Sequence, residues 1–355
     1  MGWKLLKARG TKLAFFIFLI FIVMVTFAQA EEQRQVRIAS QMPAANFGSI
    51  AVDRFCADAE RLSNGTLKFL HYPAGQLYKP EDLVDVLPAG GVEMAQIALN
   101  RFSGVTEMGN FLGPFFCNED QFVRWWYDPS SGGGFYYSHI QPAFEKINIH
   151  LISMLNYSPD HCTITKKPIK GMDDFKGLKI RSSGRNFGTI VEGLGAKAIV
   201  MSSSDVYTAI QRGTIDGAMS GASSFVSRKW YEMANHVQVL NVGNVTHSLS
   251  ANINFWKSLK PYQRYAIEEA ARLAEIWCMI ESQKDHFNSL EIMRKNGLKI
   301  IELPVEEMGM FGMQVLEKAI KPEIGEQAWN AAAQARVKVK NGEKGWVEVL
   351  ISRKM

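Results

Sequence analysis

The sequence lacks the signatures of several common protein classes. It has only four cysteines among 355 residues and no C-x-x-C pair, which argues against a thioredoxin-like or zinc-ribbon site. It contains no G-x-S-x-G elbow, no H-E-x-x-H and no dinucleotide fingerprint. The one glycine run, at 132–134, is not followed by the Lys-Ser/Thr of a phosphate loop, so a surface turn is the better interpretation.

Acidic residues are absent from the first thirty positions, which have the pattern of a secretory signal peptide. Four basic residues precede an apolar stretch at 13–27, and residues 28–30 read A-Q-A. We expect cleavage after Ala30 and export to the periplasm. The alternative is an uncleaved membrane anchor, which is disfavoured because the apolar run is short for a membrane span.

The excess of positive charge belongs to this segment. The whole chain has 40 Lys and Arg against 35 Asp and Glu. Taking away the four basic residues of the first thirty leaves 36 against 35. With no basic patch and no nucleic-acid-binding motif, we expect no nucleic-acid partner. The length favours two domains, and an apolar fraction of 47% is ordinary for a globular protein.

The cysteines leave two interpretations open. Cys56, Cys117, Cys162 and Cys278 would enter an oxidising compartment after export. They allow three complete pairings, among which the sequence cannot choose, and buried free thiols explain them equally well.

Strand-like and helix-like runs alternate along the chain. This order predicts largely parallel sheets covered by helices. In the first unit we expect strands at 36–39, 67–72 and 94–98, with helices at 49–62 and 80–90. A second unit continues with strands at 150–155 and 178–180, and the runs at 237–242 and 251–255 are predicted to cross between the units.

A long helical pattern begins at Pro261 and ends at Asn296-Gly297, a proline start and glycine stop typical of one helix. Its length of about 50 Å, at about 1.5 Å per residue, exceeds one small domain. We therefore expect a helix that either bridges two lobes or is kinked.

The segment from Gly177 to Gly217 contains the clearest candidate site. A strand at 178–180 ends in Arg181, and a helix, a strand and a further helix closing at 212–213 follow it. A charged residue at the carboxyl end of a strand in an α/β sheet opens into the crevice where ligands bind. A guanidinium offers a planar fork of donors that matches a carboxylate. Arg181 is therefore the first candidate for an acid-binding residue, and the alternative is an ordinary surface arginine.

Several blocks, all in the same order, resemble the DctP family of periplasmic solute receptors of TRAP transporters. The similarity runs from about Val36 to about Leu303. The matching blocks are HYPAGQL at 71–77, GPFF at 113–116, MDDFKGLKIR at 172–181, DVYTAIQRG at 205–213, KWYE at 229–232 and WKSL at 256–259.

The resemblance implies a bilobed, periplasmic-binding-protein-like α/β fold. Its two α/β domains would be joined by crossing strands and a long bridging helix. We expect residues 31–157 plus about 246–286 in lobe 1, and 158–245 plus about 287–355 in lobe 2, after a signal peptide at 1–30. Such a receptor captures a small organic acid by lobe closure and delivers it to a TRAP membrane permease. It is not an enzyme; no cofactor or metal is implied, and we expect a monomer.

Two departures from the family pattern bear on the ligand. In the family the strand-end arginine, here Arg181, grips the substrate carboxylate. Ser220 stands where many of these receptors have a ligand-contacting Asn, and its hydroxyl can still donate, with a shorter reach. His161 stands where sialic-acid-type members have a second arginine, so the anion site could depend on pH. A hinge-region histidine satisfied by the backbone is an equal alternative.

Other candidates lie near strand ends and in the serine run before Asp205. The expected substrate-binding set is completed by Gln41, Asn100, Arg101 and Ser203. The aromatic residues Phe102, Phe115, Trp125 and Trp126 could wall the site, although core packing is the better interpretation for each.

Two other functions remain possible from the sequence. One is a secreted α/β enzyme acting on a small carboxylate, although His161 and Cys162, being adjacent, would point to opposite faces of a strand and make a poor base–nucleophile pair. The other is a binding protein that serves a signalling partner, whose ligand chemistry would be the same.

Overall fold

The computed structural model describes residues 33–106, 134, 136–240 and 242–304, together with positions 123, 126 and 127 and single positions between 308 and 330. The chain divides into Met1–Arg34 and a compact unit, Gln35–Met355, which contains the fold. Residues 113–116, Cys117 and Trp125 lie outside the described residues. Within the described residues, no helix combines the length and apolar character needed to cross a membrane.

The first sheet has the strand order β2-β1-β3-β10-β4. β1 and β3 are parallel, as the βαβαβ pattern predicts, but β10 runs antiparallel to both β3 and β4, so the sheet is mixed. The three strands predicted at 36–39, 67–72 and 94–98 are confirmed. The strands are β1 (Arg34–Ser40), β2 (Leu67–Tyr72), β3 (Met94–Ala98), β4 (Ile149–Ser158) and β10 (Val245–Asn252).

Helices flank this sheet. α2 begins where the Asn46 side chain accepts a hydrogen bond from the Gly48 backbone N–H at 2.8 Å, an N-cap contact. The helix predicted at 80–90 is only one turn long, because Pro88 and the glycines at 90–91 follow it closely. The elements are α2 (Phe47–Leu62), α3 (Leu83–Val86), α5 (Gln141–Glu145) and α9 (Ile253–Ser258), together with the 3₁₀ helix η1 (Leu99–Phe102) and the π-helical turn η4 (Tyr136–Ile140).

The second sheet has the order β11-β9-β5-β8-β6-β7. β6 is parallel to β7 and β8, whereas β5 is antiparallel to β8 and β9. The strand–helix–strand–helix order predicted after Gly177 is confirmed. The elements are β5 (Cys162–Thr165), η5 (Met172–Phe175), β6 (Lys179–Ser182), α6 (Arg185–Gly193), β7 (Lys197–Val200), α7 (Val206–Gln211), β8 (Gly217–Ser220), α8 (Ala222–Ser227), η6 (Trp230–Met233), β9 (His236–Val239) and β11 (Lys299–Glu302).

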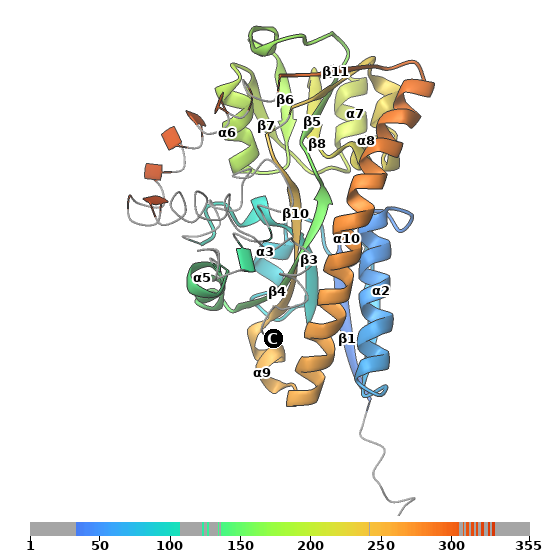
Figure 1. Cartoon of the computed structure of the whole chain (residues 1–355), viewed down its shortest axis with the longest axis vertical. Coiled ribbons are helices and arrows are strands. Elements are labelled where there is room, and N and C mark those ends of the chain that lie inside the picture. The colour runs from blue at the N-terminus through green and yellow to red at the C-terminus, as the bar shows by residue number, and fades with distance from the viewer. Residues whose placement is uncertain are drawn as a thin grey trace, which may run out of the picture. The chain divides into compact units, whose positions relative to one another are not determined.

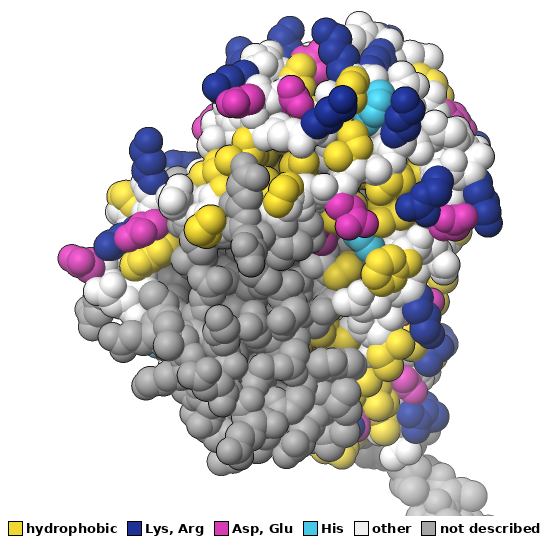
Figure 2. Space-filling model, turned by 45° about the horizontal axis from the view of Figure 1, so that its top comes forward, with side chains coloured by type: hydrophobic (Ala, Val, Ile, Leu, Met, Phe, Trp, Pro, Cys, Tyr) yellow, Lys and Arg dark blue, Asp and Glu magenta, His cyan; other side chains and the backbone are white. Residues whose placement is uncertain are grey.

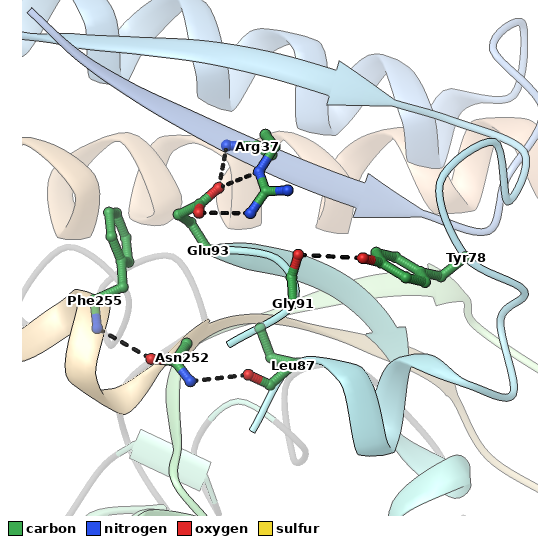
Figure 3. A network of polar contacts seen from close by, with 7 residues as sticks. All are labelled: Arg37, Tyr78, Leu87, Gly91, Glu93, Asn252 and Phe255. Carbon is green, nitrogen blue, oxygen red and sulfur yellow. Dashed lines mark hydrogen bonds and ion pairs between the residues drawn. The ribbon is translucent and has the colours of Figure 1, made fainter. Parts of the chain in front are cut away.

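The prediction of two strands that cross between the units, at 237–242 and 251–255, was wrong in detail. The run at 237–242 gives β9, which pairs only within the second sheet, with β5 and β11. The run at 251–255 is divided, because Asn252 ends β10 and its side chain accepts from the backbone N–H groups of Asn254 and Phe255, which starts α9. Figure 3 shows the contact with Phe255. The chain passes between the sheets from β4 to β5 and from β9 to β10.

The long helix is confirmed as α10 (Pro261–Lys295), and it bridges the two sheets. Its first half packs with α2 and β4 through residues such as Ile267 and Ala271. Its last turns pack into the core of the second sheet through Leu290 and Met293. Figure 1 shows α10 running beside α2 and on to α8.

The cysteines that the structure describes are buried free thiols. Cys56 and Cys278 lie in the core beneath α2 and α10, and Cys162 lies in the core of the second sheet. Burial raises the pKa of each of the three thiols.

Candidate ligand-binding site

Arg181 lies in the second sheet, on β6, with only 1% of the residue exposed. Its Nε donates to the Met201 carbonyl at 3.1 Å, and its Nη1 donates to the Met219 carbonyl at 3.3 Å. The guanidinium lies over the Trp230 ring, 5.6 Å from the ring centroid. Neutral groups therefore orient the buried charge, and they do not neutralise it.

The charges of two further arginines act on Arg181. Arg101 comes from η1, on the side of the first sheet, and its Nε donates to Gln41 Oε1 at 3.4 Å. Arg228 follows α8, and its Nη2 donates to the Gln41 backbone carbonyl at 2.7 Å, while its Nε is buried with no acceptor in the described residues. Sequence reasoning named Arg101 but missed Arg228, although it directly precedes the KWYE block.

The electrostatics show that the three arginines act on one another. Burial, with the charges of Arg101 and Arg228, lowers the pKa of Arg181 to about 9. Burial also lowers the pKa of Arg101 and of Arg228. Among the residues that the structure describes, no carboxylate forms an ion pair with any of the three. The charge of Glu81 raises the pKa of Arg101 without overcoming the effect of burial.

This cluster contrasts with the surface. On the face drawn in Figure 2, Lys and Arg side chains are interspersed with Asp and Glu. Within the part of the chain that the structure describes, the three arginines instead leave positive charge inside the protein without a counter-ion. Because a buried charge is costly unless it is paired, the arrangement suits an anion supplied from outside.

Gln41, His247 and Tyr157 form the neutral part of the cluster. Gln41 Nε2 lies 3.2 Å from His247 Nε2, and the His247 ring stacks on Tyr157 with centroids 4.7 Å apart. Burial, helped by the charges of Arg101 and Arg228, lowers the pKa of His247 to about 3. The imidazole is therefore neutral at physiological pH.

Elements of the two sheets meet at this cluster. Asn100 Nδ2 donates to Ser183 Oγ at 2.9 Å, and Asn46 Nδ2 donates to Ser223 Oγ at 2.8 Å. A Cβ on Gly184 would lie 2.7 Å from the Asn100 carbonyl oxygen, so this close approach requires glycine. The predicted candidates Gln41, Asn100 and Arg101 thus lie where both sheets contribute residues.

The two serine candidates are placed differently. Ser220 Oγ donates to Ser224 Oγ at 3.0 Å, and Ser224 Oγ lies 3.1 Å from the Tyr157 hydroxyl, so Ser220 joins a chain of hydroxyls leading to the cluster. Ser203 is buried in the loop after β7, two residues beyond the carbonyl that holds Arg181.

His161 has the contacts of a structural histidine. Its Nδ1 lies 2.7 Å from the Gly243 carbonyl, and its ring meets Phe187 edge-on at 4.3 Å. Burial lowers the pKa of His161 to about 4, so the ring is neutral at physiological pH. The further positive charges near Arg181 come from Arg101 and Arg228. The expected aromatic residues Phe102 and Trp126 lie in the core beside the first sheet.

No metal site emerges in the described part of the chain. There, no group of three or more His, Cys, Asp and Glu side chains could hold a metal ion. The buried polar side chains at the cluster are arginines, amides, hydroxyls and neutral histidines, which suit an oxyanion better than a cation.

Comparisons with known proteins found a matching family and several related proteins. A sequence profile of the family described as bacterial extracellular solute-binding protein, family 7 (DctP), matches residues 38–328. The C4-dicarboxylate-binding periplasmic protein DctP of Rhodobacter capsulatus is 26% identical over 288 residues, covering 79% of this chain and 83% of the relative. The sialic acid-binding periplasmic protein SiaP of Vibrio cholerae is 22% identical over 261 residues, covering 71% and 79%.

Solved structures share the fold. DctP6, a Bordetella pertussis extracytoplasmic solute receptor binding pyroglutamic acid, superposes with a TM-score of 0.77 at 21% identity, over 86% of this chain and 100% of that one. A TRAP periplasmic solute-binding protein of Chromohalobacter salexigens with bound D-glucuronate gives 0.77 at 20% identity, over 85% and 99%. At these identities the likeness speaks for the fold alone.

Proposed function

The chain belongs to the bacterial extracellular solute-binding proteins of family 7, the receptors of TRAP transporters, and from this premise we propose that it binds a small carboxylic acid through Arg181, Arg101 and Arg228. The receptor role follows from the family. The arginine assignment rests on one observation, which is that three mutually repelling, largely buried guanidiniums have no carboxylate partner among the described residues.

The number of charges bears on the kind of acid. One carboxylate paired with Arg181 would leave Arg101 and Arg228 without a counter-charge. An acid with a second oxygen-rich group, such as a second carboxylate or a ring carbonyl, would engage them as well. The ligands named in the descriptions of relatives include C4-dicarboxylates, pyroglutamic acid and D-glucuronate, which have this character.

We extend the proposal to the rest of the family's role. The protein would be exported with cleavage after Ala30, close on its ligand without catalysis, and deliver the acid to TRAP permease subunits. Lobe 1 would comprise residues 31–157 plus about 246–286, and lobe 2 would comprise 158–245 plus about 287–355. The further ligand contacts that we propose, after the three arginines, are Ser220, Asn100, Gln41, His161 and Ser203.

The experiment that tests the proposal is native purification followed by mass spectrometry of the released small molecules. We expect a carboxylic acid to co-purify with the wild type and to be absent from Arg181→Ala and Arg228→Ala proteins of unchanged fold. Incubation of the wild type with that acid should return it unchanged. The arginine assignment fails if the acid co-purifies with the variants as it does with the wild type.

A further inference from the structure

Gln41 connects three groups of the cluster and restricts how each of them can hydrogen-bond. Its backbone carbonyl accepts from Arg228, and its side chain lies between Arg101 and His247. A guanidinium can only donate, so the side-chain oxygen of Gln41 must face Arg101. The amide nitrogen of Gln41, which only donates, must then face His247.

This orientation selects one form of His247. The ring nitrogen that faces Gln41, Nε2, has to accept, so it carries no proton. A neutral imidazole then carries its proton on Nδ1. Nδ1 is buried and has no hydrogen-bond partner in the described residues. The ring is also held in place by stacking on Tyr157.

The structure therefore holds a buried N–H donor that nothing in the described protein satisfies. Such donors are rare in folded proteins, and they call for an explanation such as a missing ligand. The charges of Arg101 and Arg228 act on this histidine, so its free N–H lies in the same positive environment. An acceptor oxygen suits this environment, whereas a group that can only donate would be left unpaired beside two cations.

Building on the proposed function, we propose that Gln41 fixes His247 as the Nδ1–H tautomer, so that the ring donates one neutral hydrogen bond to an oxygen of the bound acid. Gln41 is then a positioning residue and His247 a specificity residue. Both favour acids with an acceptor oxygen apart from the carboxylate on Arg181, and both disfavour ligands with an ammonium group at that place.

The tautomer can be tested without any ligand. Long-range ¹H–¹⁵N correlation spectra of the ligand-free protein at neutral pH, with His247→Phe used to identify the signals, should show a protonated Nδ1 and an unprotonated Nε2. In Gln41→Glu the carboxylate can only accept, so the proton should move to Nε2. Gln76→Glu, an exposed position in the same half of the chain, adds the same charge and should leave His247 as in the wild type. An Nε2–H tautomer or an imidazolium in the wild type would overturn the inference.

The ligand contact is tested with succinate, pyroglutamate and D-glucuronate as probes. An acid that binds the wild type should shift the His247 Nδ1–H resonance. His247→Phe keeps a ring to stack on Tyr157 but has no N–H, and it should weaken binding of that acid roughly 10- to 150-fold. An unshifted resonance, or equal affinity in His247→Phe, would overturn the contact, as would a wild type that binds none of the three. None of these results affects the role of Arg181, which the co-purification experiment decides separately.

Discussion

Arg37 and Arg181 show two different uses of an arginine in one protein. Arg37 on β1 donates to Glu93 from its Nε at 2.9 Å, from its Nη2 at 2.8 Å and from its backbone N–H at 2.9 Å (Figure 3). The hydrogen bond to Glu93 raises the pKa of Arg37. Among the described residues, Arg181 donates to two carbonyls and lies over one aromatic ring, and burial lowers its pKa.

The difference separates an arginine that is paired within the fold from one that we propose pairs with an external anion. Around Arg37 the neighbouring polar groups are also satisfied, since Tyr78 donates to the Gly91 carbonyl and Asn252 donates to the Leu87 carbonyl (Figure 3). Around Arg181 the neighbouring charges repel one another. A protein retains an unfavourable arrangement of this kind where function requires it.

The largest effect should come from removing Arg181, which has no ion-pair partner among the described residues. Arg181→Ala would leave a bound carboxylate in a buried site with fewer donors, and breaking a buried charge pair costs about 3–5 kcal/mol. We expect roughly a 150- to 5,000-fold loss of affinity for the co-purified acid, measured by titration calorimetry.

Arg181→Lys is the matched control for this variant. An ammonium keeps the charge but not the bidentate fork, so only part of the affinity should return. Far-UV circular dichroism should show both variants folded. A folded Arg181→Ala protein that binds within threefold of the wild type would remove the contrast with Arg37.

The next largest effect is a change in the melting temperature of the ligand-free protein, and it should have opposite signs for Arg101 and Arg37. Arg101→Met removes one of three repelling guanidiniums from the ligand-free protein, and apolar replacement of buried charge often stabilises by about 1–2 kcal/mol. We expect the ligand-free melting temperature of Arg101→Met to rise by roughly 2 °C or more. Arg37→Met should lower it, because Glu93 loses its partner. A fall in both variants would show that the cluster is stable without an anion.

Much of the fold was predictable from local patterns. β2 (Leu67–Tyr72) and β3 (Met94–Ala98) have the predicted limits, and α10 begins at the predicted proline. Strand direction was not predictable, because β10 pairs with strands about 90 and 150 positions away along the chain, and local periodicity carries no information on such pairing. The one-turn α3 shows the same limit at a shorter range, where helix breakers overruled the helical pattern.

The candidate site was also predictable only in part. Arg181 could be predicted as a ligand contact because a strand-end arginine has a mechanism that the sequence displays, and this contact stays a prediction. Arg228 was missed because a residue after a short helix has no such signal, and its role depends on contacts with Gln41, nearly 190 positions away. The neutral state of His161 depends on burial, which lowers its pKa and outweighs the opposing hydrogen bond to the Gly243 carbonyl, and sequence order reveals neither contribution.

A smaller effect concerns the paired region, where Glu93→Gln should destabilise the protein by about 1 kcal/mol, because the pair is partly exposed to solvent. Burial opposes ionisation of Glu93, but the hydrogen bonds from Arg37 outweigh it and hold the pKa of Glu93 below its usual range. A carboxylate whose pKa is lowered by folding stabilises the folded protein at pH values above its unfolded pKa of about 4.3. The difference between wild type and Glu93→Gln in urea denaturation should therefore be present at pH 7 and vanish as the pH falls through the lowered pKa. Acid binding should be unchanged, and a weakened affinity would mean that the two regions are coupled.

The smallest effect should come from Arg61, which is paired but exposed. Its Nη2 lies 2.8 Å from Asp58 Oδ1 on α2, a distance equal to that between Arg37 Nη2 and Glu93, but 63% of the Arg61 side chain is open to solvent. Water and salt screen such a pair, so Arg61→Ala should cost less than about 0.5 kcal/mol in urea denaturation. The difference should shrink further in 1 M NaCl, where the screening length is about 3 Å. If Arg61→Ala cost as much as Glu93→Gln, contact distance rather than burial would set how much an arginine contributes to stability in this protein. The proposal for Arg181, which is buried and has no ion-pair partner among the described residues, would then lose its physical basis.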